Sequence, residues 1–414
     1  MNILTRSIKI KIRLTHDQEN LCNQFFGALR YVYNKYLEVN KDFYDVEKSF
    51  CGAYLFSQLW NHSLKPDWFT LKISKAVKDE IMTAEKAFKR FFKTKKGFPK
   101  FKSKRNPVQS IFFVKVGIRL DPKDHSRVWI PILKWIKLCE KDYLKEEMIP
   151  YITSGRIIKN SGGYFVTFML TDYPEIVKFD YSTTMDGIGI DLGITTYATI
   201  ATKMSSQATI FNPINSDRYK ILDYWIDKYN RAISNKINWN FKSHGYDISK
   251  GYPKIQKLKK GEATEIYNSH NILKLRKRIR KLSYQKQCIM EDFIKKLCNS
   301  LVRTKPEYIT IEDLSLQLES HSYLNKHNKH MRDSRFYSFR EFLTWKCSQY
   351  GIELRIADRA FPSSKICSCC GHVKKRSLAL STRVYHCKEC GTKIDRDLNA
   401  AINLAKCKKF TLAV

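Results

Sequence analysis

The sequence has no long run of uncharged residues. Nowhere in its 414 residues does an uncharged stretch reach the roughly 18 residues that a membrane-spanning helix needs. The first residues, MNILTRSIKIKIRLTH, also lack the apolar block of a secretory signal peptide. We therefore expect no membrane partner and no export. The sequence also contains no internal repeat and no low-complexity segment.

Acidic residues are scarce relative to basic ones. The chain has 75 Lys and Arg against 40 Asp and Glu, a net charge of +35. Such a charge opposes compaction unless an acidic partner neutralises it. Nucleic acid is the natural partner, because each cation that replaces a condensed counterion adds affinity. A membrane-surface binder is the alternative, but the basic residues are spread along the chain and do not form one amphipathic helix.

The twelve cysteines do not predict a disulfide scaffold, because the chain is long and shows no export signal. Four of them form two pairs with two residues between partners: Cys367, Cys370, Cys387 and Cys390. This spacing predicts a zinc ribbon, in which four thiolates fill a tetrahedral Zn²⁺ site and make it structural. Free thiols are the alternative. Cys369 could compete with Cys370, but it breaks the two-residue spacing.

The N-terminal part predicts strands with inserted helices. Residues 5–14 alternate between apolar and basic side chains, which is typical of a strand with one apolar and one cationic face. Thr15 and Gln18 have capping-box spacing at the start of a helix, and a second helix is expected from Ser74 to Phe92. Residues 110–180 then read as strands. We expect an antiparallel β domain with the helices inserted after its first strand.

The C-terminal part predicts an α/β domain. Residues 187–202 read as a buried hairpin, whereas residues 211–268 are polar and read as irregular. A long amphipathic helix is expected from Asn271 to about Arg303, followed by a strand from Tyr308 to Glu312. A helix near 335–350, a strand at 352–356 and a final helix from about Asp395 complete the pattern.

Three separated carboxylates fall within these elements. Asp191 lies in the buried hairpin, Glu312 ends a strand, and Asp397 starts the last helix. A buried carboxylate is costly unless it is paired or binds a metal. Two strands and a helix that gather three carboxylates are typical of the RNase H-like arrangement, which binds two Mg²⁺ ions. Taken singly, Asp191 could be a turn residue, Asp313 a helix cap and Asp395 an N-cap.

Two dense basic blocks are candidate nucleic-acid contacts. The first lies in the segment from Lys93 to Arg105 and the second at the start of the long helix; the candidates are Lys100, Lys102, Lys104, Arg105, Arg276, Lys277, Arg278 and Arg280. Their charge density suits contacts to a phosphate backbone. For any single residue, the alternative is an ordinary solvated basic surface.

The order of these motifs resembles the TnpB family, the OrfB accessory proteins of insertion sequences, which are related to the type V CRISPR nucleases. The similar segments are GIGIDLG, YITIEDL, CSCCG with CKECG, and DRDLNAAINLA, together with FFGALRYVYNKYL and AEKAFKRFFKTKKGFPKFKSKRN upstream. The segment SRFYSFREFLTWKCSQYGIELRIADRAFPSSKICSCCG also matches. The resemblance covers most of the chain except residues 38–70 and 211–268.

This resemblance implies a multidomain α/β fold. It implies a β-barrel wedge domain in residues 1–14 and 105–182, with a helical recognition domain inserted at 15–104. It also implies an RNase H-like (RuvC) nuclease domain in residues 183–362 and 394–414, interrupted by a zinc ribbon at 363–393. The family's catalytic triad corresponds to Asp191, Glu312 and Asp397, and its zinc ligands correspond to the four paired cysteines.

The resemblance also implies a function: an RNA-guided, Mg²⁺-dependent DNA endonuclease encoded by a transposable element. Its partners would be a guide RNA from the transposon end and double-stranded target DNA beside a short adjacent motif. We expect a monomer with its RNA, in the cytoplasm and nucleoid of a prokaryotic host. A guided DNA-binding protein or repressor without cleavage is the alternative. An unguided junction resolvase would leave the residues before Asp191 unexplained, and strand transfer by a transposase belongs to a separate partner in this family.

Overall fold

The computed structural model describes residues 5–94, 97–173, 185–203, 207–249, 251–252, 258, 261–313, 325–376 and 382–413. The chain forms two compact units, Met1–Val177 and Lys178–Val414, and each is described by itself. The domain boundary expected at 182/183 lies outside the described residues. Among the helices in the described ranges, none has the length and apolar character needed to cross a membrane.

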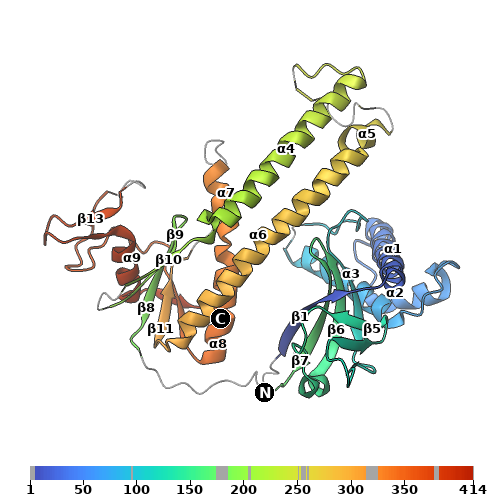
Figure 1. Ribbon diagram of the computed structural model, residues 1–414, viewed down its shortest axis with the longest axis horizontal. Helices are drawn as coiled ribbons and strands as arrows, with labels where there is room; N and C mark the ends of the chain where they lie inside the picture. Colours follow the sequence, from blue (N-terminus) through green and yellow to red (C-terminus); the bar gives the residue numbers. More distant parts are fainter. Residues whose placement is uncertain are drawn as a thin grey trace. The chain divides into compact units, whose positions relative to one another are not determined.

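A seven-stranded antiparallel sheet forms the centre of the first unit (Figure 1). Its order is β2-β6-β7-β1-β5-β4-β3, so the N-terminal strand lies in the middle and β2 and β3 form the two edges. The strands are β1 (Thr5–Arg13), β2 (Gln109–Val114), β3 (Arg119–Leu120), β4 (Arg127–Ile130), β5 (Lys134–Leu138), β6 (Ile152–Asn160) and β7 (Gly163–Thr171). The alternation expected in residues 5–14 is confirmed, because Ile8, Ile10 and Ile12 are buried.

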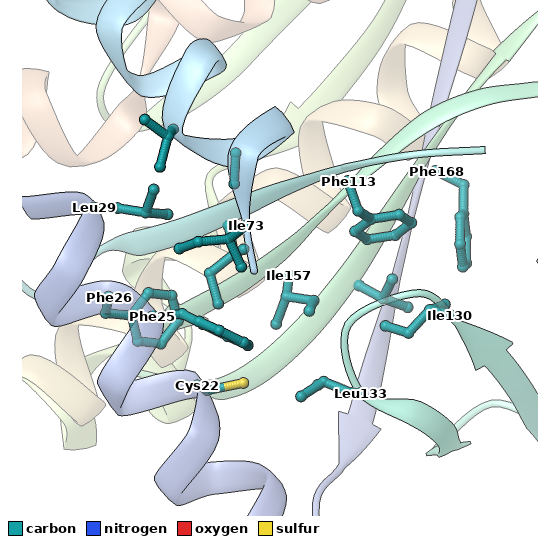
Figure 2. Close-up of a cluster of buried hydrophobic side chains, with 14 of the residues drawn as sticks. Cys22, Phe25, Phe26, Leu29, Ile73, Phe113, Ile130, Leu133, Ile157 and Phe168 are labelled. Carbon is teal, nitrogen blue, oxygen red and sulfur yellow. The ribbon is translucent and has the colours of Figure 1, made fainter. Parts of the chain in front are cut away.

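The helices of the first unit lie between β1 and β2 in the sequence. They are α1 (His16–Glu47), α2 (Ala53–Leu59), the π-helical turn η1 (Trp60–Leu64) and α3 (Ser74–Thr94); the short 3₁₀ helix η2 (Glu146–Tyr151) precedes β6. The capping box at Thr15 and Gln18 is confirmed by reciprocal hydrogen bonds of 3.1 and 3.3 Å. Figure 2 shows Phe25 and Leu29 of α1 in the core with Ile157 of the sheet. The apolar sides of α1 and of the sheet therefore form one core.

The second unit contains a mixed six-stranded sheet of order β10-β9-β8-β11-β12-β15. Its strands are β8 (Ile188–Leu192), β9 (Thr196–Thr202), β10 (Gln207–Phe211), β11 (Tyr308–Ile311), β12 (Glu353–Ala357) and β15 (Phe410–Leu412). The strands β8, β11 and β12 are parallel neighbours, so their carboxyl ends meet at one edge. The expected hairpin at 187–202 is the antiparallel pair β8 and β9.

Helices cover both faces of this sheet. The helices are α4 (Asp217–Ser243), α5 (Glu262–Asn268), α6 (His270–Arg303), α7 (Asn325–Ser334), α8 (Phe336–Tyr350) and α9 (Arg396–Ala405), with a short 3₁₀ helix η4 (Pro213–Asn215). The isoleucines of β8 and β11 pack with α6 and α8 in one core. The opposite face of the same strands meets α9. The small hairpin β13 (Val384–His386) and β14 (Lys393–Asp395) precedes α9.

The expectation that residues 211–268 are irregular is wrong. Residues 217–243 form α4, which runs beside α6, and Figure 1 shows this helix pair extending away from the sheet. Only Tyr219, Ile233, Asn240 and Phe241 of α4 are buried. Because α4 packs mainly against one other long helix, it needs only a narrow apolar stripe, and this stripe is hidden among polar residues in the sequence.

A buried lysine joins α6 to α4 and α7. The Lys286 ammonium donates to Asp223 of α4 and, at 2.9 Å, to Asp333 of α7. It also lies 4.5 Å from the centre of the Tyr219 ring. Burial raises the pKa of Asp223, but the hydrogen bond and charge of Lys286 outweigh it and leave the pKa below its ordinary value of 3.8. The carboxylate therefore contributes stability above that value and loses it only as the pH falls through the lowered pKa.

Replacing Lys286 with methionine should lower the free energy of unfolding of the second unit by about 3–5 kcal/mol, because two carboxylates lose their buried partner. Urea denaturation at pH 5–8 would measure this loss. The difference in unfolding free energy between the variant and wild type should decrease below about pH 4. Lys296→Met is the matched control, since the Lys296 ion pair with Asp292 is exposed and should be worth less than about 1 kcal/mol. Equal losses of unfolding free energy in Lys286→Met and Lys296→Met would show that burial of the lysine does not determine its contribution to stability.

Candidate active site and metal centre

Asp191 and Glu312 are neighbours at the carboxyl ends of two parallel strands. The register pairs Thr310 with Gly189 and Ile311 with Ile190, so the next positions along the strands are Glu312 and Asp191. Because side chains alternate along a strand, Asp191 shares a face with Gly189, and Glu312 shares it with Thr310. Ile309 and Ile311 lie on the opposite face, in the core with α6 and α8. Asp191 lies within β8 and is not a turn residue.

Helix α9 covers this same face. A Cβ atom added at Gly189 would lie 2.1 Å from the carbonyl oxygen of Ala401, so only glycine permits this close approach. The Tyr308 hydroxyl fixes the far end of the helix by donating to the carbonyl of Ala405 at 2.8 Å. Asp397 lies in the first turn of α9. The packing of α9 therefore brings the third carboxylate toward the ends of β8 and β11.

Asp395 is the N-cap of α9, as one of the alternatives predicted. Its Oδ1 accepts from the backbone N–H groups of Asp397 and Leu398, both at 2.9 Å. Asp313 instead accepts from the guanidinium of Arg340 at 2.9 Å. Asp395 therefore caps a helix and Asp313 pairs with an arginine, so both acids have structural roles.

The three carboxylates interact electrostatically. Burial raises the pKa of Asp191 well above its ordinary range, and the negative charges of Glu312 and Asp397 raise it further. Burial and the charge of Asp395 also raise the pKa of Asp397, and the guanidinium of Arg383, 3.6 Å away, opposes this. A cation among these groups would relieve both the burial cost and the repulsion.

Hard divalent cations take carboxylate oxygens, so this donor set fits Mg²⁺. The carboxylates are less tightly gathered than the paired cysteines. Within the described ranges, the four thiols form the one group of metal-binding side chains whose ligand atoms all lie within 4.8 Å of one another. The acidic site therefore rests on strand register, helix packing and shared charge.

Replacing Asp191 with asparagine should stabilise the protein in magnesium-free buffer. The pKa of Asp191 is raised in the folded state, so ionisation of this acid destabilises the fold. This destabilisation is absent below the ordinary value of 3.8 and grows as the pH rises. At pH 8 we expect the melting temperature to rise by roughly 2–4 °C, as about 1 kcal/mol does for such a domain. Differential scanning calorimetry would measure the rise, which should shrink toward pH 4. The exposed Asp292→Asn serves as control, and equal shifts in both variants would exclude the proposed cause.

The four paired cysteines fit a tetrahedral metal. The sulfurs of Cys367 and Cys390 are 3.6 Å apart, and those of Cys370 and Cys387 are 3.7 Å apart. A tetrahedron with Zn–S bonds of about 2.3 Å has edges of about 3.8 Å. Bonds from the hydroxyl and backbone N–H of Thr392 lower the pKa of Cys390 to about 6. These residues can hold one Zn²⁺ ion.

The two cysteine turns have the same backbone form. Gly371 and Gly391 follow the second cysteine of each pair and have positive φ angles of 77° and 73°. Their N–H groups donate to the carbonyls of Cys367 and Cys387 at 2.9 and 3.1 Å. Cys369 is exposed and lies outside the four-thiol cluster. Spacing in the sequence therefore selected the right cysteine of the adjacent pair for this cluster.

The predicted basic residues differ in their surroundings. Lys102 donates to the buried Glu80 and lies 4.2 Å from the centre of the Tyr33 ring, so it packs within the first unit. Arg276 donates to the side chain of Asn268 at 2.7 Å and is also partly buried. The remaining six candidates are exposed: Lys100, Lys104, Arg105, Lys277, Arg278 and Arg280. Of the eight predicted basic residues, these six present their charge to solvent.

Several residues at the acidic site escaped the sequence analysis. Ser363 donates its hydroxyl to Glu312, and Arg383 of the ribbon faces Asp397. The buried Asn399 and Asn403 of α9 hold the chain that leads into the first cysteine pair. The last two did leave a signal, because two asparagines four residues apart interrupt an otherwise apolar helix face.

Two family models match the chain. Residues 336–404 match the Cas12f1-like TNB domain, a range that runs from α8 through the cysteine pairs into α9. Residues 1–49 match the helix-turn-helix domain of the OrfB proteins of IS605. Both matches agree with the expected resemblance to the TnpB family. In this chain the segment of the second match contains strand β1 followed by the single helix α1.

Two relatives are similar to this chain over nearly its whole length. A candidate RNA-guided DNA endonuclease of Streptomyces pristinaespiralis is 27% identical over 98% of this chain and 89% of its own. The candidate RNA-guided DNA endonuclease InsQ of Escherichia coli strain K12 is 22% identical over 99% of this chain and 93% of its own. The cryo-EM structure of a Cas12f1–sgRNA–target DNA complex has a similar fold, with a TM-score of 0.50 and 14% identity over 99% of this chain and 100% of that one.

Proposed function

We propose that this chain is an RNA-guided DNA endonuclease of a transposable element, which cuts target DNA beside a short adjacent motif. The observation that carries the proposal is the register of β8 and β11, which sets Asp191 beside Glu312 on the face covered by the helix of Asp397. Relatives that match nearly the full chain are named as candidate enzymes of this kind. The excess of basic residues suits a complex with RNA and DNA.

The proposed architecture assigns a role to each part of the chain. Residues 1–14 and 105–182 would form the wedge domain and residues 15–104 the recognition domain. Residues 183–362 and 394–414 would form the RuvC-like nuclease domain, with the target-binding zinc ribbon at 363–393. β1 lies at the centre of a sheet whose other strands come from residues 109–171, and this supports one wedge domain built from residues 1–14 and 105–182. The sheet is open, with β2 and β3 at its two edges. We further propose a monomer with its guide RNA in the cytoplasm of a prokaryotic host.

The acidic residues would hold Mg²⁺ and the four cysteines would hold Zn²⁺. When bound, the magnesium ions would activate the attacking water and stabilise the leaving 3′ oxygen. The chain itself gathers the three carboxylates on two strands and a helix and keeps each of them partly buried. A zinc site filled by four thiolates has no open position and would stabilise the ribbon.

A guided binding protein without cleavage is the second candidate. Its basic surfaces would be the same, and only the three carboxylates separate it from a nuclease. All three carboxylates are present, and the charges of Glu312 and Asp397 raise the pKa of Asp191, whereas Asp313 pairs with Arg340 and Asp395 caps α9. The arrangement therefore favours the nuclease.

The proposal can be tested with the intact complex. RNA that co-purifies with the protein would be sequenced and should match DNA flanking the gene. The complex would then be incubated with a plasmid library that carries the guide-matched target beside randomised flanks. We expect Mg²⁺-dependent cleavage of targets with one short flanking motif. Guide-dependent binding without cleavage would favour the second candidate, and the absence of a defined RNA would overturn both.

The six exposed basic residues should contribute to RNA affinity through phosphate neutralisation. Replacing Lys100, Lys104 and Arg105 with glutamine, or Lys277, Arg278 and Arg280 in a second variant, should weaken RNA binding. Each lost contact should reduce the salt slope for single-stranded RNA by roughly 0.7. Filter binding at several salt concentrations would measure both effects. Lys102→Gln is the control and should leave the salt slope unchanged, because the Lys102 ammonium already pairs with Glu80. An unchanged salt slope in a triple variant would show that the three residues replaced in it do not contact RNA.

A further inference from the structure

Glu312 has a partner that the proposed chemistry does not account for. Ser363 lies on the segment between β12 and the first cysteine pair and is only 4% exposed. Its hydroxyl donates to Oε1 of Glu312, 51 residues earlier in the chain. A carboxylate with one oxygen held in this way has fewer orientations available than a free one.

Ser363 is itself held by the helix that carries Asp397. The Asn403 side-chain amide donates to the carbonyls of Ser363 and Ile366, each at 2.8 Å. One turn earlier, Asn399 donates to Ile366 at 2.8 Å and accepts from the Ser368 N–H at 2.9 Å. Both asparagines are buried, so water cannot readily replace these bonds. The segment from Ser363 to Ser368 is thereby fixed to α9 through its backbone.

We propose that Ser363 is a positioning residue that orients Glu312 for binding a divalent cation, and this rests on the function proposed above. Helix α9 then sets two of the three carboxylates: it carries Asp397 directly and sets Glu312 through the Ser363 hydroxyl. Hydrogen bonds from neighbouring groups to a metal-binding carboxylate typically change metal affinity 10–100-fold. The backbone bonds to the asparagines do not involve the hydroxyl, so Ser363→Ala removes the contact to Glu312 and keeps the connection to α9.

The experiment uses the full-length chain with its guide RNA. Mn²⁺ affinity is measured by electron paramagnetic resonance without DNA, and the Mg²⁺ dependence of cleavage is measured with target DNA. Ser363→Ala should weaken Mn²⁺ binding by about tenfold and raise the Mg²⁺ needed for half-maximal cleavage by a similar factor. Ser363→Thr, which keeps a hydroxyl, should restore both. Ser348→Ala, which removes an exposed hydroxyl bonded to the Trp345 carbonyl at 2.9 Å, should match wild type.

A double-mutant cycle separates positioning from a general structural role. In a Glu312→Gln background, Ser363→Ala should cause no further loss of Mn²⁺ affinity, because its effect passes through Glu312. Additive losses, wild-type Mn²⁺ affinity in Ser363→Ala, or loss of zinc and of cooperative melting in that variant would each overturn the inference. If wild type binds neither Mn²⁺ nor a guide RNA, the proposed function fails first, and that outcome is recognised before any variant is compared.

Discussion

Replacing Asp191, Glu312 or Asp397 with alanine is expected to abolish target cleavage while guided DNA binding persists. The carboxylates would hold the catalytic cations, whereas basic residues and base pairing would hold the target. Removing a metal ligand should cost several kcal/mol of transition-state stabilisation. Because each 1.4 kcal/mol corresponds to a factor of ten, we expect cleavage to fall at least about a thousand-fold. Single-turnover cleavage and gel-shift measurements on the same complexes would separate the two activities.

The start of α9 offers a matched control for this experiment. Asp395 lies two residues before Asp397 and caps the helix by accepting two backbone N–H groups. Asparagine is as good an N-cap as aspartate, so Asp395→Asn should preserve the helix and the cleavage rate. Asp397→Asn should lose cleavage. Wild-type rates for any of the three site variants would remove that residue from the site, and equal losses at 395 and 397 would indicate damage to the helix.

Removal of zinc should have the second large effect. Wild-type protein should contain about one Zn²⁺ per chain, held by four thiolates. Cys370→Ser should lose the metal and unfold the hairpin of β13 and β14, because the binding of structural zinc is worth about 10–16 kcal/mol in comparable small sites. Within the described part of the ribbon, the buried apolar cluster consists of Cys367, Tyr385 and Cys387. Two of these three side chains are proposed zinc ligands, so the cluster itself depends on the metal.

Cys369 provides the matched control for the zinc experiment. It is the neighbour of Cys370 but is exposed and outside the thiol cluster. Cys369→Ser should keep the zinc content and the hydrogen-exchange protection of residues 384–395, as measured by mass spectrometry. Loss of zinc in this variant would show that Cys369 is a ligand. Folded, active wild-type protein without zinc would exclude the metal site altogether.

Local patterns predicted the elements that carry the acidic site. The strand expected at Tyr308–Glu312 is β11, whose apolar face packs against α6 and α8. The capping box at Thr15 and the cysteine spacing also depend on residues close in sequence, and the structure has both features. In each case the physical constraint extends over a few residues, so the sequence displays it directly.

Features that depend on contacts between residues far apart in the sequence could not be predicted from local patterns. Nothing near Ser363 indicates that its hydroxyl meets Glu312, and nothing near Lys102 indicates that it pairs with Glu80. Helix α4 was missed because its few buried residues contact α5, α6 and η4, and its polar surface resembles a loop in composition. Packing between segments decided each of these cases.

The central place of β1 has a consequence for how the first unit is synthesised. β1 pairs with β7 from Thr5 to Ile12 and with β5 through Ile12 and Arg13, and both partners follow it by more than a hundred residues. At about 5–20 residues per second, the ribosome takes roughly ten to thirty seconds to reach Thr171. Until residues 134–138 of β5 emerge, β1 has no partner strand, and until β7 emerges its other edge stays unpaired. The alternating Lys9, Lys11 and Arg13 would protect the nascent chain from aggregation until its partners emerge.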